Sequence, residues 1–214
     1  MAQKTSGRGS SVSAKEKTRE KKSGELFKST VSDRYRDILD AAATLFAERG
    51  YIATSVRDIG ERVGLLGGSL YHHIKSKEAL YTEIHDIALQ SAADHILEAV
   101  SKHTDPWARF EAACVKMLEL ELDPHSITMP LMNDFRSVPP EVQRRLVPKR
   151  DEFEQVFVGL IKDLPLDPRI DRSIYRILLL TLLNNVNIWY REGPLTPADI
   201  GRQIVMIFRH DAPA

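Results

Sequence analysis

The chain has 214 residues, of which 43% are hydrophobic and 28% are charged, so it can bury one large core or two smaller ones. Its single cysteine, Cys114, excludes a disulfide framework and a cysteine-rich zinc site, and no apolar run reaches the roughly 18 residues that a membrane-spanning helix needs. The formal net charge of zero conceals an asymmetry, because residues 1–32 hold eight basic and three acidic side chains while residues 82–214 hold 15 basic and 20 acidic ones. The N-terminal segment is polar and unlike a secretory signal, so we expect a soluble, intracellular protein without a membrane partner.

Residues 1–30 are rich in Ser, Lys, Gly and Glu and contain few large apolar side chains. Such a segment cannot bury enough surface to offset the entropy of ordering it, so we expect it to be disordered. Two interpretations remain open. The segment is either a basic arm that lies on DNA phosphates or in a minor groove, or a solubilising leader without specific contacts.

The first helix is predicted over residues 33–49, where apolar residues recur at helical spacing. Ser32 or Asp33 can cap its first turn. Gly50 follows directly and can end the helix in a left-handed conformation, which glycine adopts without steric cost.

Two short helices around a glycine turn are predicted next. The first begins at Ser55, which forms a capping-box pattern with Asp58, and it ends at Gly64. The second covers residues 68–74. This arrangement is typical of a helix-turn-helix, whose second helix enters the major groove of DNA.

The remainder of the chain keeps a helical pattern, with prolines at the starts and boundaries of helices. The predicted helices cover residues 76–102, 106–121, 125–136, 140–163, 168–191 and 197–209. Pro148 lies inside one of them and is expected to kink or split it. The predicted fold class is all-α, with a helix-turn-helix three-helix DNA-binding domain followed by a helical ligand-binding and dimerisation domain.

The second short helix has an inward and an outward set of side chains. Leu70 and Ile74 are four residues apart and should face the core, which leaves the polar and aromatic side chains outside. The expected contacts to DNA bases and phosphates are Thr54, Ser55, Gly67, Gly68, Ser69, Tyr71, His72, His73 and Lys77. The alternative is a small helical hairpin with chance aromatic residues.

The stretch Asp37–Leu80 resembles the N-terminal DNA-binding domain of the TetR family of bacterial transcriptional regulators. The residues that carry this resemblance are ILDAAATLFAERGYIATSVRDIGERVGLLGGSLYHHIKSKEAL. The resemblance implies an all-helical homodimer that represses transcription until a small molecule binds its C-terminal domain. It also implies that Tyr51 packs the first helix against the unit and that Lys77 contacts a phosphate. At Leu66 and Gly67 the sequence departs from the family, many members of which carry a serine and a basic or polar residue there.

Two C-terminal helices are expected to form the interface between protomers. The helix over 168–191 is apolar over most of its circumference, and the last helix has an apolar stripe. A homodimer also follows from the helix-turn-helix, since two half-sites about one DNA turn apart need two reading units. The predicted interface residues are Ile174, Leu178, Leu182, Asn185, Trp189, Ile200, Ile204 and Phe208.

A small-molecule effector is expected to bind among the middle helices, where aromatic and methionine side chains could form an adaptable apolar chamber. The candidates are Trp107, Phe110, Met117, His125, Met129, Met132, Asn133, Phe153, Asn184 and Asn187. The aromatic and methionine side chains could equally form an ordinary core, and the asparagines could instead pair across the two-fold axis.

The effector class is indicated by one short segment. The ending WYREGPLT resembles TetR members that respond to acyl-CoA thioesters, so an acyl-CoA or another apolar acid is expected. Four basic residues either hold a CoA phosphate or form a solvated face: Arg144, Arg145, Lys149 and Arg150.

Catalytic and metal sites are not predicted. The sequence has no nucleotide-binding loop and no GxSxG or HExxH motif, and its cysteine lacks a positioned base. His72 and His73 cannot share a metal, because adjacent helical residues diverge by about 100°. No cofactor is expected.

We therefore expect a cytoplasmic, nucleoid-associated bacterial repressor that an effector releases from a palindromic double-stranded operator. Residues 1–30 would be the disordered arm, 31–80 the DNA-binding domain, and 81–214 the effector-binding and dimerisation domain. The alternatives are an activator or a ligand-independent DNA binder and, from another class, a helical small-molecule carrier or an enzyme that reuses the fold.

Overall fold

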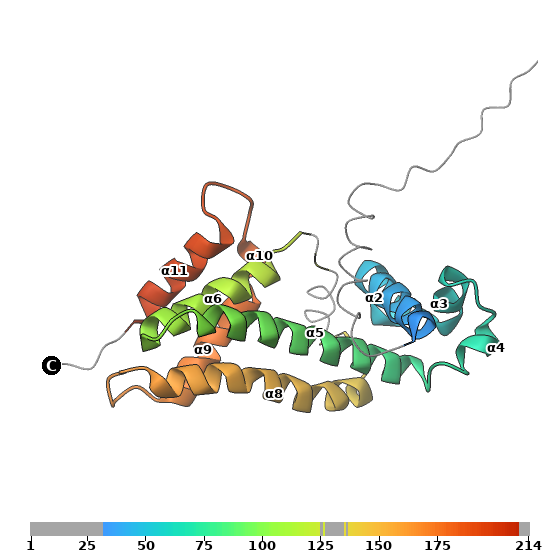
Figure 1. The fold of residues 1–214 in the computed structure, drawn as a ribbon, viewed down its shortest axis with the longest axis horizontal. Coiled ribbons are helices and arrows are strands. Elements are labelled where there is room, and N and C mark those ends of the chain that lie inside the picture. The colour runs from blue at the N-terminus through green and yellow to red at the C-terminus, as the bar shows by residue number, and fades with distance from the viewer. Residues whose placement is uncertain (1–31, 125, 127–134, 136, 210–214) are drawn as a thin grey trace, which may run out of the picture.

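The computed structural model describes residues 32–124, 126, 135 and 137–209, and within these ranges it contains nine α-helices and no β-strand (Figure 1). The predicted all-α fold class is confirmed. The predicted arm over residues 1–30 and most of the predicted helix over 125–136 lie outside the described residues. The helices are α2 (Asp33–Ala53), α3 (Val56–Arg62), α4 (Gly67–Leu70), α5 (Lys77–Ser101), α6 (Pro106–Glu121), α8 (Pro140–Asp163), α9 (Arg172–Asn184), α10 (Val186–Trp189) and α11 (Pro197–Phe208).

The predicted caps at the starts of α2 and α3 are confirmed, but the predicted end of the first helix at Gly50 is a kink, after which helical residues continue to Ala53. The Ser32 hydroxyl accepts a hydrogen bond from the amide of Tyr35, and Ser55 and Asp58 form the complete capping box. Gly50 and Gly64 both have positive φ, at 76° and 68°. Such values strain residues with a side chain, so these two glycines make the reversals around the helix-turn-helix possible.

One apolar core joins α2, α3 and α4 to the first turns of α5. At its centre, the ring of Tyr81 lies 5.1 Å from that of Phe46 and 5.0 Å from that of Tyr51, both edge to face. Val142 and Leu146, in the first turns of α8, are fully buried in the same core. The helix-turn-helix is therefore packed against a helix that lies far away in the sequence.

A second apolar core lies at the other end of the molecule, among α6, α8, α9, α11 and the last turns of α5. The helix α11 crosses α6 at Gly201, where a Cβ atom would lie only 2.9 Å from the Cα of Val115. Figure 1 shows α5 extending from the helix-turn-helix into this second group of helices, with α8 beside it. Both α5 and α8 thus connect the two cores.

The predicted helix over residues 168–191 is wrong in its extent. It begins at Arg172 after the cap of Asp171, and it is interrupted at Asn185, which separates α9 from α10. The side-chain amide of Asn185 donates to the carbonyl of Thr181 at 2.7 Å. In a continuous helix the backbone amide of Asn185 would donate to this carbonyl. The side-chain amide competes for the same acceptor, which explains the interruption.

The bounds of the helix predicted over residues 140–163 are confirmed, whereas the recognition element differs from its prediction. The helix α8 continues through Pro148, so this proline does not split it. Pro148 is exposed, and water can therefore solvate the carbonyl that loses its backbone partner. The recognition element predicted over residues 68–74 is shorter, because α4 ends at Leu70 and turns follow. Among the described residues, no helix is long and apolar enough to cross a membrane.

Candidate functional site

The outer face of α4 and the turn after it carry the side chains predicted to contact DNA. Leu70 and Ile74 are buried as predicted and hold this segment against α3. Tyr71 is 58% exposed, and the side chains of His72 and His73 are exposed beside it. Ser69 is half-buried. The structure therefore leaves the side chains of Tyr71, His72 and His73 accessible and that of Ser69 partly so.

Two residues next to this group, Gly68 and Leu66, are left accessible by the packing of the protein. A Cβ atom added at Gly68 would meet no atom within 4 Å, so the space in front of this backbone is open. The side chain of Leu66, which directly precedes α4, is 82% exposed. Leu66 is absent from the predicted contacts, although a large apolar residue in a glycine-rich turn is a signal for an exposed contact. Gly67, another predicted contact, is the first residue of α4.

The hydroxyl groups of Thr54 and Ser55, predicted to contact phosphates, are used within the fold. The Thr54 hydroxyl is buried and lies 3.2 Å from the carbonyl oxygen of Leu45 and 2.9 Å from that of Gly50. The Ser55 hydroxyl lies 2.7 Å from the carboxylate of Asp58 and accepts from its amide at 3.1 Å. The hydroxyl and the backbone amide of Ser55 both donate to the Asp58 carboxylate, and these two hydrogen bonds hold the pKa of Asp58 below its usual range. Ser55 is exposed, whereas Thr54 is not.

Lys77 also has a structural role that its sequence position does not reveal. Its ammonium group donates to the carbonyl oxygens of Tyr51 at 3.0 Å and Thr54 at 2.9 Å. It lies 4.1 Å from the centre of the Tyr51 ring, a cation–π arrangement. Lys77 therefore ties the start of α5 to the end of α2, and at most one of its three N–H donors is left for a phosphate.

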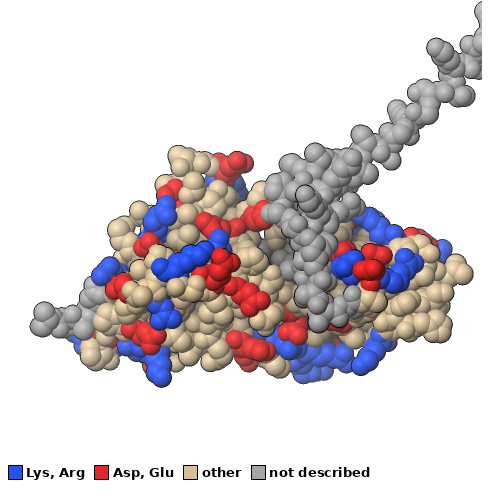
Figure 2. Space-filling model, viewed as in Figure 1, with Lys and Arg blue, Asp and Glu red and all other residues tan. Residues whose placement is uncertain are grey.

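Basic and acidic side chains balance in the segment that forms this end of the molecule. Residues 33–81 hold seven basic and seven acidic side chains. In the view of Figure 2, the surface at the α3–α4 end is mainly uncharged, and basic side chains gather instead near the start of α8. A nucleic acid bound at the α3–α4 end would therefore depend on close contacts with α4 more than on a broad basic surface.

The predicted effector residues are divided between a closed core and outer positions. Trp107, Phe110 and Met117 are buried in the core around α6. Phe153 packs against the same core beside Phe157. These four residues line neither of the hollows next to α9, which are described below. The side chains predicted in the segment after α6, His125, Met129, Met132 and Asn133, lie outside the described residues.

A pocket of about 480 Å³ lies between α8 and α9, and it includes Asn184 of the predicted set, whereas Asn187 is exposed elsewhere. Its charged groups are Arg150, Glu154 and Arg176, and the guanidinium of Arg176 is hydrogen-bonded to the carboxylate of Glu154. Arg176 and Glu154 are absent from the predicted site. The signal for Arg176 is that no other charged residue lies between Ser173 and Asn184. The pocket also contains Phe135, Ile177, Leu180, Thr181, Asn185 and Ile188.

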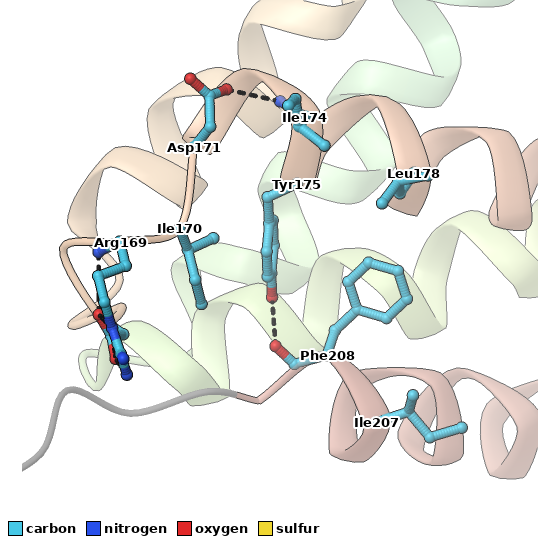
Figure 3. A pocket seen from close by; sticks show the side chains of 9 residues that line it. Arg169, Ile170, Asp171, Ile174, Tyr175, Leu178, Ile207 and Phe208 are labelled. Atoms are coloured by element: carbon cyan, nitrogen blue, oxygen red, sulfur yellow. Dashed lines mark hydrogen bonds and ion pairs between the residues drawn. The ribbon is translucent and has the colours of Figure 1, made fainter.

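A larger hollow of about 810 Å³ lies between the start of α9 and the end of α11 (Figure 3). Its polar groups are bonded within the chain. The Tyr175 hydroxyl donates to the carbonyl of Phe208 at 2.9 Å, and Arg169 is paired with Asp167. Asp171 accepts from the amide of Ile174 at the start of α9. This hollow therefore presents mainly apolar surface.

Part of the predicted dimer interface forms an exposed apolar face on α9, α10 and α11. Ile174, Leu178 and Trp189 are each more than half exposed, and Asn185 is exposed beside them. Four further large apolar side chains of these helices are also more than half exposed and were not predicted: Ile177, Ile188, Met206 and Ile207. We call these seven apolar residues the α9–α11 face. Ile174, Leu178 and Ile207 line one hollow, and Ile177 and Ile188 line another. Exposed apolar side chains that gather in this way often mark an interaction site.

The other predicted interface residues lie further inside. Ile200 and Ile204 are buried in the core of their own chain, because this side of α11 packs on α6. Leu182 and Phe208 are half-buried and pack against the same core. The outward side of α11 is instead formed by Met206 and Ile207.

The described residues offer no group of three or more His, Cys, Asp or Glu side chains that could hold a metal ion. Cys114 is buried, and burial raises the pKa of its thiol. A thiol with a raised pKa is a poor nucleophile, because the thiolate is the reactive form.

Comparisons with known proteins find similarity to one family of regulators in both halves of the chain. A model of bacterial regulatory proteins of the tetR family matches residues 38–84, and a model of a tetracyclin repressor-like C-terminal domain matches residues 103–211. The HTH-type transcriptional repressor KstR2 of Rhodococcus jostii is 34% identical over 183 residues, which cover 82% of this chain and 89% of that protein.

Solved structures are also similar to this chain over most of its length. The structure of the ketosteroid transcriptional regulator KstR2 of Mycobacterium tuberculosis has a TM-score of 0.59 and 28% identity, and the match covers 84% of this chain and 94% of that one. The superantigen PfiT, with a TM-score of 0.73 and 24% identity over 84% of this chain and 97% of its own, shares the fold. One family model matches the helix-turn-helix, the other matches the helices of the second core, and the R. jostii relative covers 82% of the chain. The chain therefore belongs to the TetR family of bacterial regulatory proteins.

Proposed function

We propose that this protein is a cytoplasmic transcriptional repressor that binds a palindromic operator as a homodimer and leaves it when a small apolar effector binds. The relative from R. jostii is named a transcriptional repressor, which supports repression over activation. A regulator of this kind acts by binding and carries out no catalysis.

The surface of α4 and the turn after it is the observation that carries the proposal. The open space at Gly68 and the exposed side chains of Leu66 and Tyr71 have no packing role in their own chain. A DNA major groove admits a helix whose backbone and short side chains approach the base edges closely. The Tyr71 hydroxyl and the imidazoles of His72 and His73 can donate and accept hydrogen bonds there, and Leu66 suits the methyl group of a thymine.

A second copy of the chain is the proposed occupant of the α9–α11 face. This face exposes seven large apolar side chains, half of the large apolar side chains that are exposed among the described residues, and apolar surface that gathers in this way often marks a site of association. Two copies paired through α9 and α11 would carry two α4 elements, one for each half of a palindromic operator.

The route from effector to DNA would use the two helices that the cores share. The start of α5 and the first turns of α8 pack in the core of the helix-turn-helix, and their later turns pack in the second core. A ligand that shifts α8 relative to α5 would therefore change the position of α4. Release from DNA requires that the effector bind the DNA-incompetent arrangement more tightly than the competent one.

The effector class is inferred from the apolar lining and the relatives. The M. tuberculosis relative is a ketosteroid transcriptional regulator, and ketosteroids are largely apolar molecules. The pocket between α8 and α9, at about 480 Å³, is within the range of small-molecule sites. An apolar effector of modest size is therefore proposed for this chain.

A substitution at Gly68 separates a role in DNA binding from a role in folding. Because a Cβ atom there meets nothing, Gly68→Ala should leave the protein equally stable or raise its stability by up to about 1 kcal/mol. If DNA approaches this backbone, the same methyl group should weaken binding to DNA by about tenfold or more. Gly159→Ala, at an exposed and equally open glycine of α8, is the matched control and should leave DNA affinity unchanged.

The measurement is fluorescence anisotropy with a duplex from the promoter region upstream of the protein's own gene, at several salt concentrations. Specific binding should exceed binding to a scrambled duplex and should weaken as salt rises. Equal affinity for both duplexes would contradict the repressor function and would favour a carrier or another binding role. An unchanged affinity of Gly68→Ala would contradict the assignment of this surface as the DNA-reading face.

A further inference from the structure

The charges of the α8–α9 pocket are balanced among the described residues. The guanidinium of Arg176 is hydrogen-bonded to the carboxylate of Glu154. Burial lowers the pKa of Arg150, and the carboxylates of Glu154 and of the buried Glu121, at the end of α6, act against this. His85 is neutral at physiological pH, because burial and the nearby Arg150 lower its pKa to about 4. Two positive groups are therefore matched by two negative groups.

An ion that entered this pocket would find no free opposite charge among these groups. The side chains of Arg176 and Glu154 are only 25% and 33% exposed. Moving a charge from water into such a place is costly unless an opposite charge pairs with it. A carboxylate would have to displace Glu154, and an ammonium group would have to displace Arg176, and either ion would add one net charge. The pocket is therefore suited to an uncharged molecule.

One uncharged polar group remains available in the lining. Asn184 is half-buried, and its side-chain amide has no hydrogen-bond partner among the described residues. The neighbouring Asn185 differs, since its amide already donates to the carbonyl of Thr181 at 2.7 Å. An asparagine amide both donates and accepts hydrogen bonds. Asn184 can therefore bind either a carbonyl or a hydroxyl group.

The remaining lining is suited to an apolar body. Phe135, Ile177, Leu180 and Ile188 provide the apolar walls. The volume of about 480 Å³ equals the room taken by roughly 16 liquid water molecules, which is enough for a molecule of medium chain length. The pocket thus combines an apolar space with a single uncharged polar contact.

We propose that the α8–α9 pocket binds an uncharged apolar molecule with a carbonyl or hydroxyl group, which pairs with the amide of Asn184. The hydrocarbon part lies against Leu180 and Ile188, and the ion pair of Arg176 with Glu154 stays intact. A ketone, an alcohol or the acyl part of an ester meets these conditions, whereas a free carboxylate or an ammonium ion does not. This inference rests on the proposed function only in taking the bound molecule as the effector.

The position of the pocket connects the bound molecule with both cores and with the proposed dimer. Ile177 and Ile188 belong both to the pocket and to the α9–α11 face. Glu154 and Arg150 lie on α8, two and one turns beyond the part of this helix that packs with the helix-turn-helix. A molecule in the pocket therefore contacts the helix that joins the two cores.

The test is isothermal titration calorimetry on the full chain without DNA at neutral pH, using decan-1-ol, decan-2-one, decanoate and decylammonium. At least one of the two neutral compounds should bind, and each ion should bind at least about tenfold more weakly than that compound. Asn184→Leu should weaken the neutral compounds about threefold to tenfold, as expected for one lost hydrogen bond. Asn187→Leu, at an exposed position outside the lining, is the matched control and should leave all affinities unchanged.

Two charge substitutions separate the proposal from damage to the fold. Glu154→Gln leaves these groups with one net positive charge, so it should strengthen decanoate binding several-fold and leave decylammonium as weak as before. Arg176→Gln leaves one net negative charge and should have the opposite effect on the two ions. A damaged pocket would weaken every ligand, so it cannot produce these opposite shifts.

The proposal is overturned if neither neutral compound binds, or if an ion binds the wild type as tightly as they do. It is also overturned if Asn184→Leu leaves the neutral affinities unchanged, or if both charge substitutions shift decanoate in the same direction. Binding of a neutral compound that fails to release DNA would contradict the proposed effector response and would leave the binding site standing.

Discussion

Replacement of His85, in the middle of α5, should remove much of the acid sensitivity of folding. The side chain is fully buried, and neither ring nitrogen has a hydrogen-bond partner among the described residues. Its ring packs 5.7 Å from that of Tyr81. Burial, and after it the positive charge of Arg150, lowers the pKa of His85 from 6.5 to about 4, while Asp86 acts weakly in the opposite direction.

The sign and size of the effect follow from linkage between protonation and folding. In the unfolded chain the imidazole takes up a proton near pH 6.5, whereas in the folded chain it stays neutral until about pH 4. The contribution of this group is therefore fully present above about pH 6.5 and is lost as the pH falls toward 4. The pKa difference corresponds to about 3 kcal/mol, which is a large part of the roughly 5–15 kcal/mol that keeps a typical domain folded.

The assay is urea unfolding followed by circular dichroism, at several pH values between 7.5 and 4 and at one fixed protein concentration. The leucine in His85→Leu cannot titrate and leaves no buried nitrogen. As the pH falls from 7.5 to 4, the wild type should therefore lose about 3 kcal/mol more of its free energy of unfolding than His85→Leu loses. His95→Leu, at an exposed position of the same helix, should behave like the wild type. If wild type and His85→Leu lose the same stability toward pH 4, the imidazole is protonated in the folded state and the reasoning is refuted.

Three further predictions concern packing, capping and assembly. Gly201→Ala should destabilise the protein by about 1–3 kcal/mol, because the new methyl group meets the backbone of Val115; urea unfolding measures this, and a neutral result would mean that α11 can move away from α6. Ser55→Ala removes the capping box of α3 and should lower the free energy of unfolding by about 1 kcal/mol in the same assay. An unchanged free energy would mean that tertiary packing alone holds α3. Ile207→Asp places a charge on the α9–α11 face and should shift the protein from dimer to monomer in sedimentation velocity; a species of unchanged mass would contradict the proposed interface.

The helix ends around the helix-turn-helix could be predicted from the sequence because they depend on neighbouring residues. Gly50 and Gly64 adopt the left-handed conformation, and Ser55 pairs with Asp58 three residues away. The inward position of Leu70 follows in the same way from helical spacing. In each case the interacting groups are separated by only a few residues, so the local pattern contains the whole cause.

The candidate sites depended on segments that are far apart in the chain. Lys77 donates to carbonyls 26 and 23 residues earlier, and no local pattern reveals these acceptors. Arg150 and Arg176 come from different helices and share a pocket only after α8 packs against α9. Trp107 looked like a ligand contact by composition, but the packing of α6 places it in a closed core.

The sequence by itself determined the fold class, the family and the helix-turn-helix, because helix periodicity, capping and glycine turns are local properties of the chain. Only the tertiary structure decided which polar groups are left over for function. Thr54 is turned inward to bond carbonyls of α2, while Gly68 and Leu66 are left facing open space. The physical reason is that a buried polar group needs a hydrogen-bond partner. Which partner it has depends on how helices that are distant in the sequence pack together.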